Sequence, residues 1–252
     1  MHLVVSAMDE ATAPPWSSWQ GHALVVGAGG IGQALAALLA QQAPQLTLHV
    51  ATRRPAGPAE LGLDLCDDGQ LEQLGALAQQ HWQPLRLVIN TAGLLHSPEL
   101  QPEKRLSAID RAQLERSFAV NAFGPVLLAK AVAAALPRDQ PSHFASLSAR
   151  VGSIGDNQLG GWYSYRAAKA AQNQLLRTLA IEWRRRLPQC CVSLLHPGTT
   201  ATPLSAPFRS GVAATALFSA EQAANYLLAV LAARTPADSG SFWAWDGQPI
   251  PW

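Results

Sequence analysis

The feature that most constrains the fold of this chain is an alternation of two kinds of segment. Short apolar runs rich in valine and leucine alternate with longer stretches rich in alanine and leucine. The first kind is typical of buried strands and the second of helices. Strands that alternate with helices build a parallel sheet covered by helices on both faces. The sequence therefore predicts an α/β fold with a doubly wound sheet of about seven strands.

The pattern places each element along the 252 residues. The predicted strands are residues 22–26, 46–52, 61–63, 85–90, 142–147, 190–195 and 241–245. The predicted helices are residues 31–42, 67–80, 109–136 with a break, 163–187 and 220–233. We expect residues 1–20 to form an irregular extension and residues 21–252 to form a single domain, because this length and 48% hydrophobic residues suit one large core.

Charge and cysteine content exclude several classes of function. The net charge is +1 and the arginines are scattered, so we expect no nucleic-acid or membrane partner. Cys66, Cys190 and Cys191 lack metal-ligand spacing, as do the seven histidines, which predicts a cytoplasmic protein without a metal site. No apolar run approaches the roughly 20 residues that span a bilayer, and the N-terminus lacks the order of a signal peptide.

A glycine-rich turn joins the first predicted strand to the first predicted helix. Gly27, Gly29 and Gly32 stand at the spacing GxGxxG, with Ile31 between the last two. Glycines let the backbone approach a pyrophosphate, whose charge then lies at the N-terminus of the helix. In this strand-turn-helix context the motif predicts a dinucleotide site in a Rossmann-type sheet.

The end of the second predicted strand bears on the choice of dinucleotide. Sites for NAD usually carry an acidic residue here, whereas this chain has Arg53 and Arg54. A guanidinium is suited to a 2′-phosphate, which favours NADP over NAD. The alternative is that both arginines are solvated loop charges.

Tyr165 and Lys169 are four residues apart in a predicted helix and therefore lie on one face of it. A phenol beside an ammonium can transfer protons, because the cation favours the phenolate. The pair alone occurs by chance in many surface helices.

With these motifs, residues 22–252 resemble the short-chain dehydrogenase/reductase family. In finer detail they are similar to its C-factor and sniffer-like carbonyl reductases, through residues 152–157, 160–165 and 245–252. The resemblance implies a cofactor site to which further residues contribute, namely Asp64, Leu65, Asn90, Ala92, Gly93, Pro197, Gly198 and Thr199. It also implies that Tyr165 is the proton donor, that Lys169 holds the nicotinamide ribose, and that Asn121 holds a water near the lysine.

Two positions depart from the family's pattern. The glycine turn is one residue shorter than the family's Gly-xxx-Gly-x-Gly loop, whose first glycine would fall at Val26. The catalytic serine of the family falls at Ala149, so Ser148 becomes the candidate that polarises the carbonyl, with Ser153 as the alternative.

These inferences favour an NADP(H)-dependent oxidoreductase that transfers a hydride to or from a small apolar carbonyl or alcohol. Residues 202–218 are expected to form a lid over an apolar pocket. Two alternatives stay open: a signalling or regulatory protein that binds the cofactor without turnover, and an NAD-dependent alcohol dehydrogenase. We also expect a homodimer or homotetramer, because residues 122–136 and 167–179 are apolar on more than one helical face.

Overall fold

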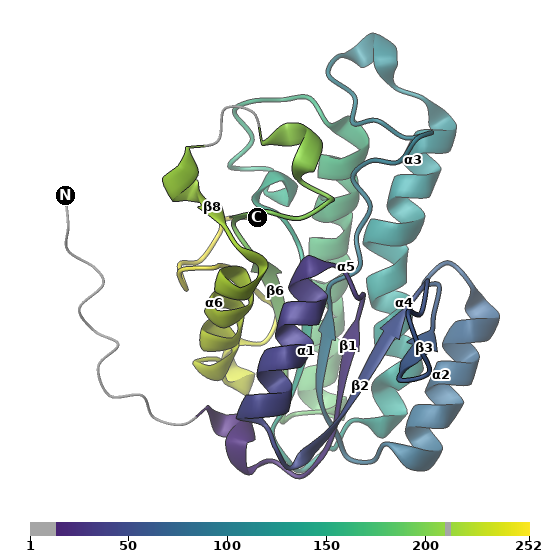
Figure 1. The fold of residues 1–252 in the computed structure, drawn as a ribbon, viewed down its shortest axis with the longest axis vertical. Coiled ribbons are helices and arrows are strands. Elements are labelled where there is room, and N and C mark those ends of the chain that lie inside the picture. Colours follow the sequence, from purple (N-terminus) through teal and green to yellow (C-terminus); the bar gives the residue numbers. More distant parts are fainter. Residues whose placement is uncertain (1–13, 210–212) are drawn as a thin grey trace.

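The computed structural model describes residues 14–209 and 213–252, and its main feature is one seven-stranded parallel sheet (Figure 1). The strand order is β3-β2-β1-β4-β5-β6-β9. The strands are β1 (Gly21–Val26), β2 (Leu46–Thr52), β3 (Glu60–Gly62), β4 (Leu85–Asn90), β5 (Ser142–Leu147), β6 (Cys190–His196) and β9 (Ser241–Ala244). The predicted sheet of about seven strands is confirmed.

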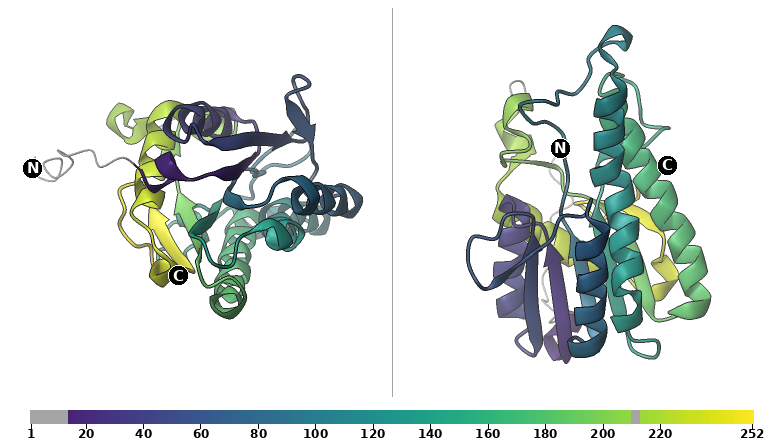
Figure 2. Two further views of the ribbon diagram at one scale, coloured as in Figure 1. Left: turned by 90° about the horizontal axis from the view of Figure 1, so that it is seen from below. Right: turned by 90° about the vertical axis from the view of Figure 1, so that its right-hand side faces the viewer.

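Helices cover both faces of this sheet (Figure 2). On one face lie α1 (Gly30–Gln42) and α6 (Ala220–Ala232), which pack against each other. On the other face lie α2 (Asp68–His81), α4 (Gly124–Val132) and α5 (Tyr163–Arg186). A short helix α3 (Arg111–Phe118) runs into α4 through a π-helical turn, Ala119–Phe123, so the segment predicted as a broken helix changes helix type there without being interrupted.

Two apolar cores, one on each face, hold the layers together. Leu24, Leu128 and Leu176 belong to the core under α2, α4 and α5, and Leu35 and Leu227 belong to the core under α1 and α6. All five are at most 1% exposed. Because successive side chains of a strand point to opposite faces, β1 contributes Leu24 to one core and Val25 to the other.

The N-terminal segment enters the second of these cores. Residues 1–13 of the predicted irregular extension lie outside the described residues. Pro15–Ser18 forms one turn of 3-10 helix and buries the indole of Trp16 completely. Trp19 stacks on His143 of β5 with ring centroids 5.7 Å apart. Residues 15–19 therefore pack the segment that precedes β1 against the sheet.

The continuous helical run Arg111–Ala135 corrects the expectation that no apolar run in this chain approaches the length that spans a bilayer. It is 25 residues long and contains an 18-residue window of mean hydropathy 1.6, which is long and apolar enough to cross a membrane. Within this fold, α4 packs against α2 and α5. Its apolar character therefore follows from its place in a helical layer, with 44% of that window buried.

The topology also fixes where a ligand can bind. From β1 the sheet continues in one direction to β2 and β3 and in the other to β4, β5 and β6. At such a reversal the loops that follow the strands diverge and leave a crevice at their carboxyl ends. The glycine turn after β1 and the loops after β2, β4, β5 and β6 all lie at this edge.

Candidate active site

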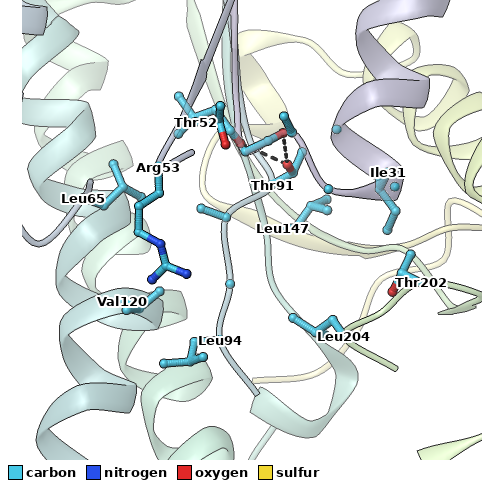
Figure 3. Close-up of a pocket in the computed structure, with 18 of the residues that line it drawn as sticks. Ile31, Thr52, Arg53, Leu65, Thr91, Leu94, Val120, Leu147, Thr202 and Leu204 are labelled. Carbon is cyan, nitrogen blue, oxygen red and sulfur yellow. Dashed lines mark hydrogen bonds between the residues drawn. The ribbon is translucent and has the colours of Figure 1, made fainter. Parts of the chain in front are cut away.

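A pocket of about 400 Å³ opens at the carboxyl ends of the strands (Figure 3). Thirteen of the residues predicted for the site line it. Two of them are Tyr165 and Lys169, and the other eleven are Gly27, Gly29, Ile31, Gly32, Arg53, Asp64, Leu65, Ala92, Gly93, Pro197 and Ser148. The pocket thus joins the glycine turn at one end to the tyrosine and lysine at the other.

The glycine turn is shaped by close contacts that exclude side chains. Gly27 has φ +97°, a left-handed conformation that favours glycine, and a Cβ on Gly32 would lie 1.8 Å from the Gly27 carbonyl oxygen. Thr91, which directly follows β4, braces the turn, since its hydroxyl donates to the carbonyls of Val26 and Gly27, each at 3.0 Å. A Cβ on Gly29 would meet no atom within 4 Å. The backbone at Gly29 is therefore open to the pocket.

The first turn of α1 suits an anion. Among the described residues, its N-cap Gly29 offers no side-chain hydrogen bond and its first turn holds no acidic residue. The free N–H groups of a helix N-terminus and its dipole favour negative charge. A pyrophosphate fits this cradle, and Gly29 and Ile31 would lie beside it.

Arg53 follows the last residue of β2 and points into the pocket on the side of Val120 (Figure 3). Asp64 and Leu65, after β3, line the same region. The Asp64 side chain accepts a hydrogen bond from the Cys66 N–H at 3.0 Å, which orders the turn after β3. The cation at the end of β2 therefore faces the space where the ribose end of a dinucleotide would lie.

Asn90 does not line the pocket but supports it. Its amide donates to the Ser146 hydroxyl at 2.9 Å and accepts from the Ala92 N–H at 3.1 Å. Asn90 is fully buried at the end of β4. These bonds join β4 to β5 and hold the turn at Ala92 and Gly93 along the pocket.

Tyr165 and Lys169 lie one turn apart on α5, 7% and 2% exposed. The Lys169 Nζ is 5.8 Å from the Tyr165 ring centroid and donates to the Leu147 carbonyl and to Gln172 Oε1, each at 2.9 Å. Burial lowers the pKa of Lys169 to about 7 and raises the pKa of Tyr165. The expectation that the nearby cation lowers the pKa of Tyr165 is wrong for this structure, because the effect of desolvation on that pKa exceeds the effect of the cation.

Of the two candidate serines, only Ser148 lines the pocket. Its hydroxyl donates to Asn173 Oδ1 of α5 at 2.7 Å, so α5 holds this serine as well as Tyr165. The Ser153 hydroxyl accepts from the Asp156 N–H at 3.2 Å and orders the loop after β5. The geometry favours Ser148 over Ser153 for contact with a substrate.

Besides Asn90, three predicted residues lie away from the pocket wall. Asn121 is fully buried in the π-helical turn, where it bonds the Leu94 N–H at 2.9 Å and the Leu94 carbonyl at 2.7 Å. Gly198 takes φ +75°, and a Cβ there would lie 2.6 Å from Phe218. Thr199 forms a two-residue ladder between β7 (Thr199–Thr200) and β8 (Leu217–Phe218). Asn121 thus positions the pocket residue Leu94, and the other two shape the base of the segment that leads to α6.

Sequence reasoning missed the polar residues that hold these groups. The fully buried Gln172 carries the Lys169 ammonium on Oε1 and donates through Nε2 to the Ser146 hydroxyl at 2.9 Å. Its position three residues after Lys169, on the same helical face, was the available signal. The chain from Lys169 through Gln172 and Ser146 ends at Asn90. Across the described residues, no three His, Cys, Asp or Glu side chains gather as a metal site would require.

Comparison with known proteins identifies the family to which this chain belongs. A family model for short chain dehydrogenases matches residues 21–213. The chain belongs to the short-chain dehydrogenase/reductase family. It is therefore an oxidoreductase of a family that binds a nicotinamide cofactor and acts on small molecules.

Two relatives support this membership. The C-signal protein of Myxococcus xanthus is 32% identical over 148 residues, which cover 58% of this chain and 83% of that protein. The 1-hydroxy-2-glutathionyl-2-methyl-3-butene dehydrogenase of Rhodococcus sp. (strain AD45) is 31% identical over 195 residues, which cover 77% and 80%.

Solved structures of carbonyl reductases share the fold of this short-chain dehydrogenase/reductase. The NADPH-bound carbonyl reductase from chicken fatty liver has a TM-score of 0.79 at 24% identity, with 92% of this chain and 99% of that chain covered. The carbonyl reductase Sniffer of D. melanogaster has a TM-score of 0.78 at 23% identity, with 93% and 100% covered. The resemblance drawn from the motifs is confirmed by these matches.

Proposed function

We propose that this chain is an NADP(H)-dependent carbonyl reductase for small apolar carbonyl compounds, or the corresponding alcohol dehydrogenase. The observation that carries the proposal is the convergence of Ser148, Tyr165 and Lys169 at one end of a pocket whose other end holds Arg53 and the glycine turn. Leu94, Leu204 and Val120 add apolar surface to the lining of this pocket.

Each polar residue of the pocket has a separate role in the proposed reaction. When bound, the nicotinamide supplies or accepts the hydride. Tyr165 keeps its proton at neutral pH because burial raises its pKa, so it can donate that proton to a carbonyl oxygen. Ser148, anchored by Asn173, would orient the carbonyl. Lys169 would hold the ribose, and Gln172 holds its ammonium near Tyr165.

A panel of carbonyl compounds with NADPH tests the activity. Oxidation of NADPH, followed at its absorbance maximum, supports the reductase. NADPH that binds tightly without oxidation by any compound would instead support the cofactor-binding signalling protein, which the similarity to C-signal favours.

Arg53 tests the preference for NADP. A charge-assisted hydrogen bond is worth about 1.5–3 kcal/mol, so Arg53→Ala should weaken NADPH binding by about 10- to 100-fold and leave NADH binding nearly unchanged. Arg54→Ala is the matched control, since Arg54 is exposed and does not line the pocket. Equal losses for NADPH and NADH, or equal losses in both variants, would contradict the assignment.

We further propose that the chain forms a dimer or tetramer through α4 and α5. Phe123, at the start of α4, is 49% exposed and Ile181, on α5, is 48% exposed. Large apolar side chains on adjacent helices favour burial against a second copy. Light scattering should give a multiple of 26.8 kDa, and a mass of 26.8 kDa at micromolar concentration would contradict the oligomer.

A further inference from the structure

A strained turn precedes the helix that carries Tyr165. Gly160, Gly161 and Trp162 have φ values of +63°, +66° and +52°. Two glycines adopt this left-handed region freely, but a tryptophan does so at a cost of about 1–2 kcal/mol. Trp162 is the only residue other than glycine with positive φ in the described part of the chain. A conformation of this kind persists only where surrounding contacts enforce it, and such sites cluster where function needs them.

The carboxyl group of Glu103 supplies these contacts from a distant loop. Glu103 lies between β4 and α3, 61 residues before Ser164, and is 2% exposed. Its Oε2 accepts from the Ser164 N–H at 3.1 Å and from the Ser164 hydroxyl at 3.0 Å. Its main-chain carbonyl accepts from the Trp162 N–H at 2.5 Å. One residue therefore bonds both the strained residue and the first turn of α5.

Local sequence leaves α5 without a cap of its own. In the described structure, the N-cap residue Trp162 makes no side-chain capping bond and the first turn of α5 contains no acidic residue. Free N–H groups at a helix start normally find a side-chain oxygen nearby, and a negative charge there is stabilising. Glu103 fills this role from outside the helix.

The burial of this carboxyl group is costly and unusual. None of the three ion pairs formed by the described residues involves Glu103. Its second oxygen, Oε1, is buried and finds no hydrogen-bond partner among those residues. A buried carboxyl group destabilises a fold unless hydrogen bonds offset its lost hydration. An exposed cap residue would stabilise α5 at lower cost, so capping alone does not explain this arrangement.

The hydrogen bond from the Trp162 N–H to Glu103 holds the main chain that carries the Trp162 indole. The indole packs edge-on against the Tyr165 ring, with centroids 6.3 Å apart, and against the Phe208 ring at 5.0 Å. Phe208 lies just beyond Pro203 and Leu204, which line the pocket. Trp162 thus stands between the proposed proton donor and the segment expected to cover the substrate.

We propose that Glu103 is a positioning residue for the reaction at Tyr165. It holds the left-handed turn at residues 160–162 and the first turn of α5, so that Trp162 is fixed between Tyr165 and Phe208. Arg166 holds the same turn from within α5, because its Nε donates to the carbonyls of Gly160 and Gly161 at 3.2 and 3.0 Å. The proposal rests on the reductase activity proposed above.

Glu103→Ala tests it, with NADPH as cofactor and 4-nitrobenzaldehyde as the probe substrate. A small displacement of a catalytic group costs about 10²-fold in rate, so kcat/KM for the aldehyde should fall by about that factor. The dissociation constant of NADPH should stay unchanged, because the hydrogen bonds of Glu103 among the described residues go to Trp162 and Ser164 and none reaches the glycine turn. Glu103→Gln retains an acceptor oxygen and should recover part of the loss.

Asp110→Ala is the matched control. Asp110 ends the same loop and caps α3 by accepting from the Gln113 N–H at 3.1 Å, but it makes no bond to α5. If kcat/KM for the aldehyde is the same in Glu103→Ala, in Asp110→Ala and in the unmodified chain, the proposal is overturned. An equal loss in Glu103→Ala and Asp110→Ala, which would reflect general destabilisation, overturns it too.

Hydrogen exchange separates this proposal from the proposed activity. In Glu103→Gln and Glu103→Ala, the amides of Trp162 and Ser164 should exchange faster than in the unmodified chain, because their acceptors are weakened or displaced. If the unmodified chain reduces no carbonyl compound, the reductase proposal fails. Hydrogen exchange still tests whether Glu103 holds the turn at residues 160–162. Unchanged protection at both amides would then overturn the role of Glu103.

Discussion

The turn between β1 and α1 and the turn before α5 both enter the left-handed region, but by different means. In the first, Gly27 takes φ +97° without a side-chain penalty. In the second, Trp162 takes φ +52° and is bonded by Glu103 from a loop 59 to 61 residues away along the chain. The conformation of the glycine turn therefore rests mainly on its own residues, with Thr91 as a brace, whereas the turn before α5 depends on hydrogen bonds from Glu103.

The two ends of the pocket also differ in whether their polar groups are open to a ligand or bonded within the protein. The glycine turn leaves backbone N–H groups open for a ligand. Around Tyr165 and Lys169, the buried side chains of Ser148 and Asn173 bond each other, and the buried Gln172 bonds the Lys169 ammonium and the Leu147 carbonyl. A locally encoded turn tolerates change elsewhere in the chain, while a buried polar network loses stability and geometry when one member is removed.

Removal of the Tyr165 hydroxyl should produce the largest effect and should affect only the end of the pocket that holds Tyr165. Tyr165→Phe removes the proposed proton donor but retains the buried ring, so turnover should fall by about 10²- to 10⁴-fold. NADPH binding, measured by fluorescence titration, should remain near that of the unmodified chain. Near-normal turnover would show that another group donates the proton.

Ser148 should have the next largest effect. Loss of one hydrogen bond to the reacting oxygen typically costs about 10²- to 10³-fold in kcat, which is the result expected for Ser148→Ala. Ser153→Ala is the matched control, because Ser153 is equally buried but does not line the pocket. If steady-state kinetics show the larger loss for Ser153→Ala, the serine assignment is reversed.

The glycine turn gives an effect on stability instead. Gly32→Ala places a methyl group against the Gly27 carbonyl and should destabilise the fold by about 1–3 kcal/mol in urea unfolding. Gly29→Ala meets open space, so stability should persist while cofactor affinity falls. Equal stability of the two variants would contradict the local encoding of this turn.

Lys169 should give the smallest effect, a change in the pH dependence of stability. Burial lowers its pKa from 10.5 to about 7 in the fold, so above pH 7 the unfolded chain binds more protons at this site. Stability should therefore rise with pH between 7 and 8.5, relative to Lys169→Met, by up to about 1.4 kcal/mol per pH unit. Urea unfolding of both proteins across this window measures it, and parallel pH profiles would contradict the shift.

Much of the fold was predictable because its signals are local. The seven strands of the sheet and the main helices begin and end within a few residues of the predicted positions, since apolar periodicity reflects burial on both faces. The β7 and β8 pair escaped prediction because strands of two residues carry no periodicity. The residues of the glycine turn and Arg53 were also predictable, because each stands beside the strand that places it.

The sequence by itself thus determined the sheet, the glycine turn and the positions of Tyr165 and Lys169 on one helical face. Only the tertiary structure decided which residues hydrogen-bond one another. Gln172 bonds Lys169 and Asn173 bonds Ser148. Asn121 bonds Leu94, and Glu103 bonds Trp162. The physical reason is the range of each interaction. Helix, strand and glycine-turn preferences depend on neighbouring residues, whereas contacts such as that between Glu103 and Ser164 depend on how whole layers pack.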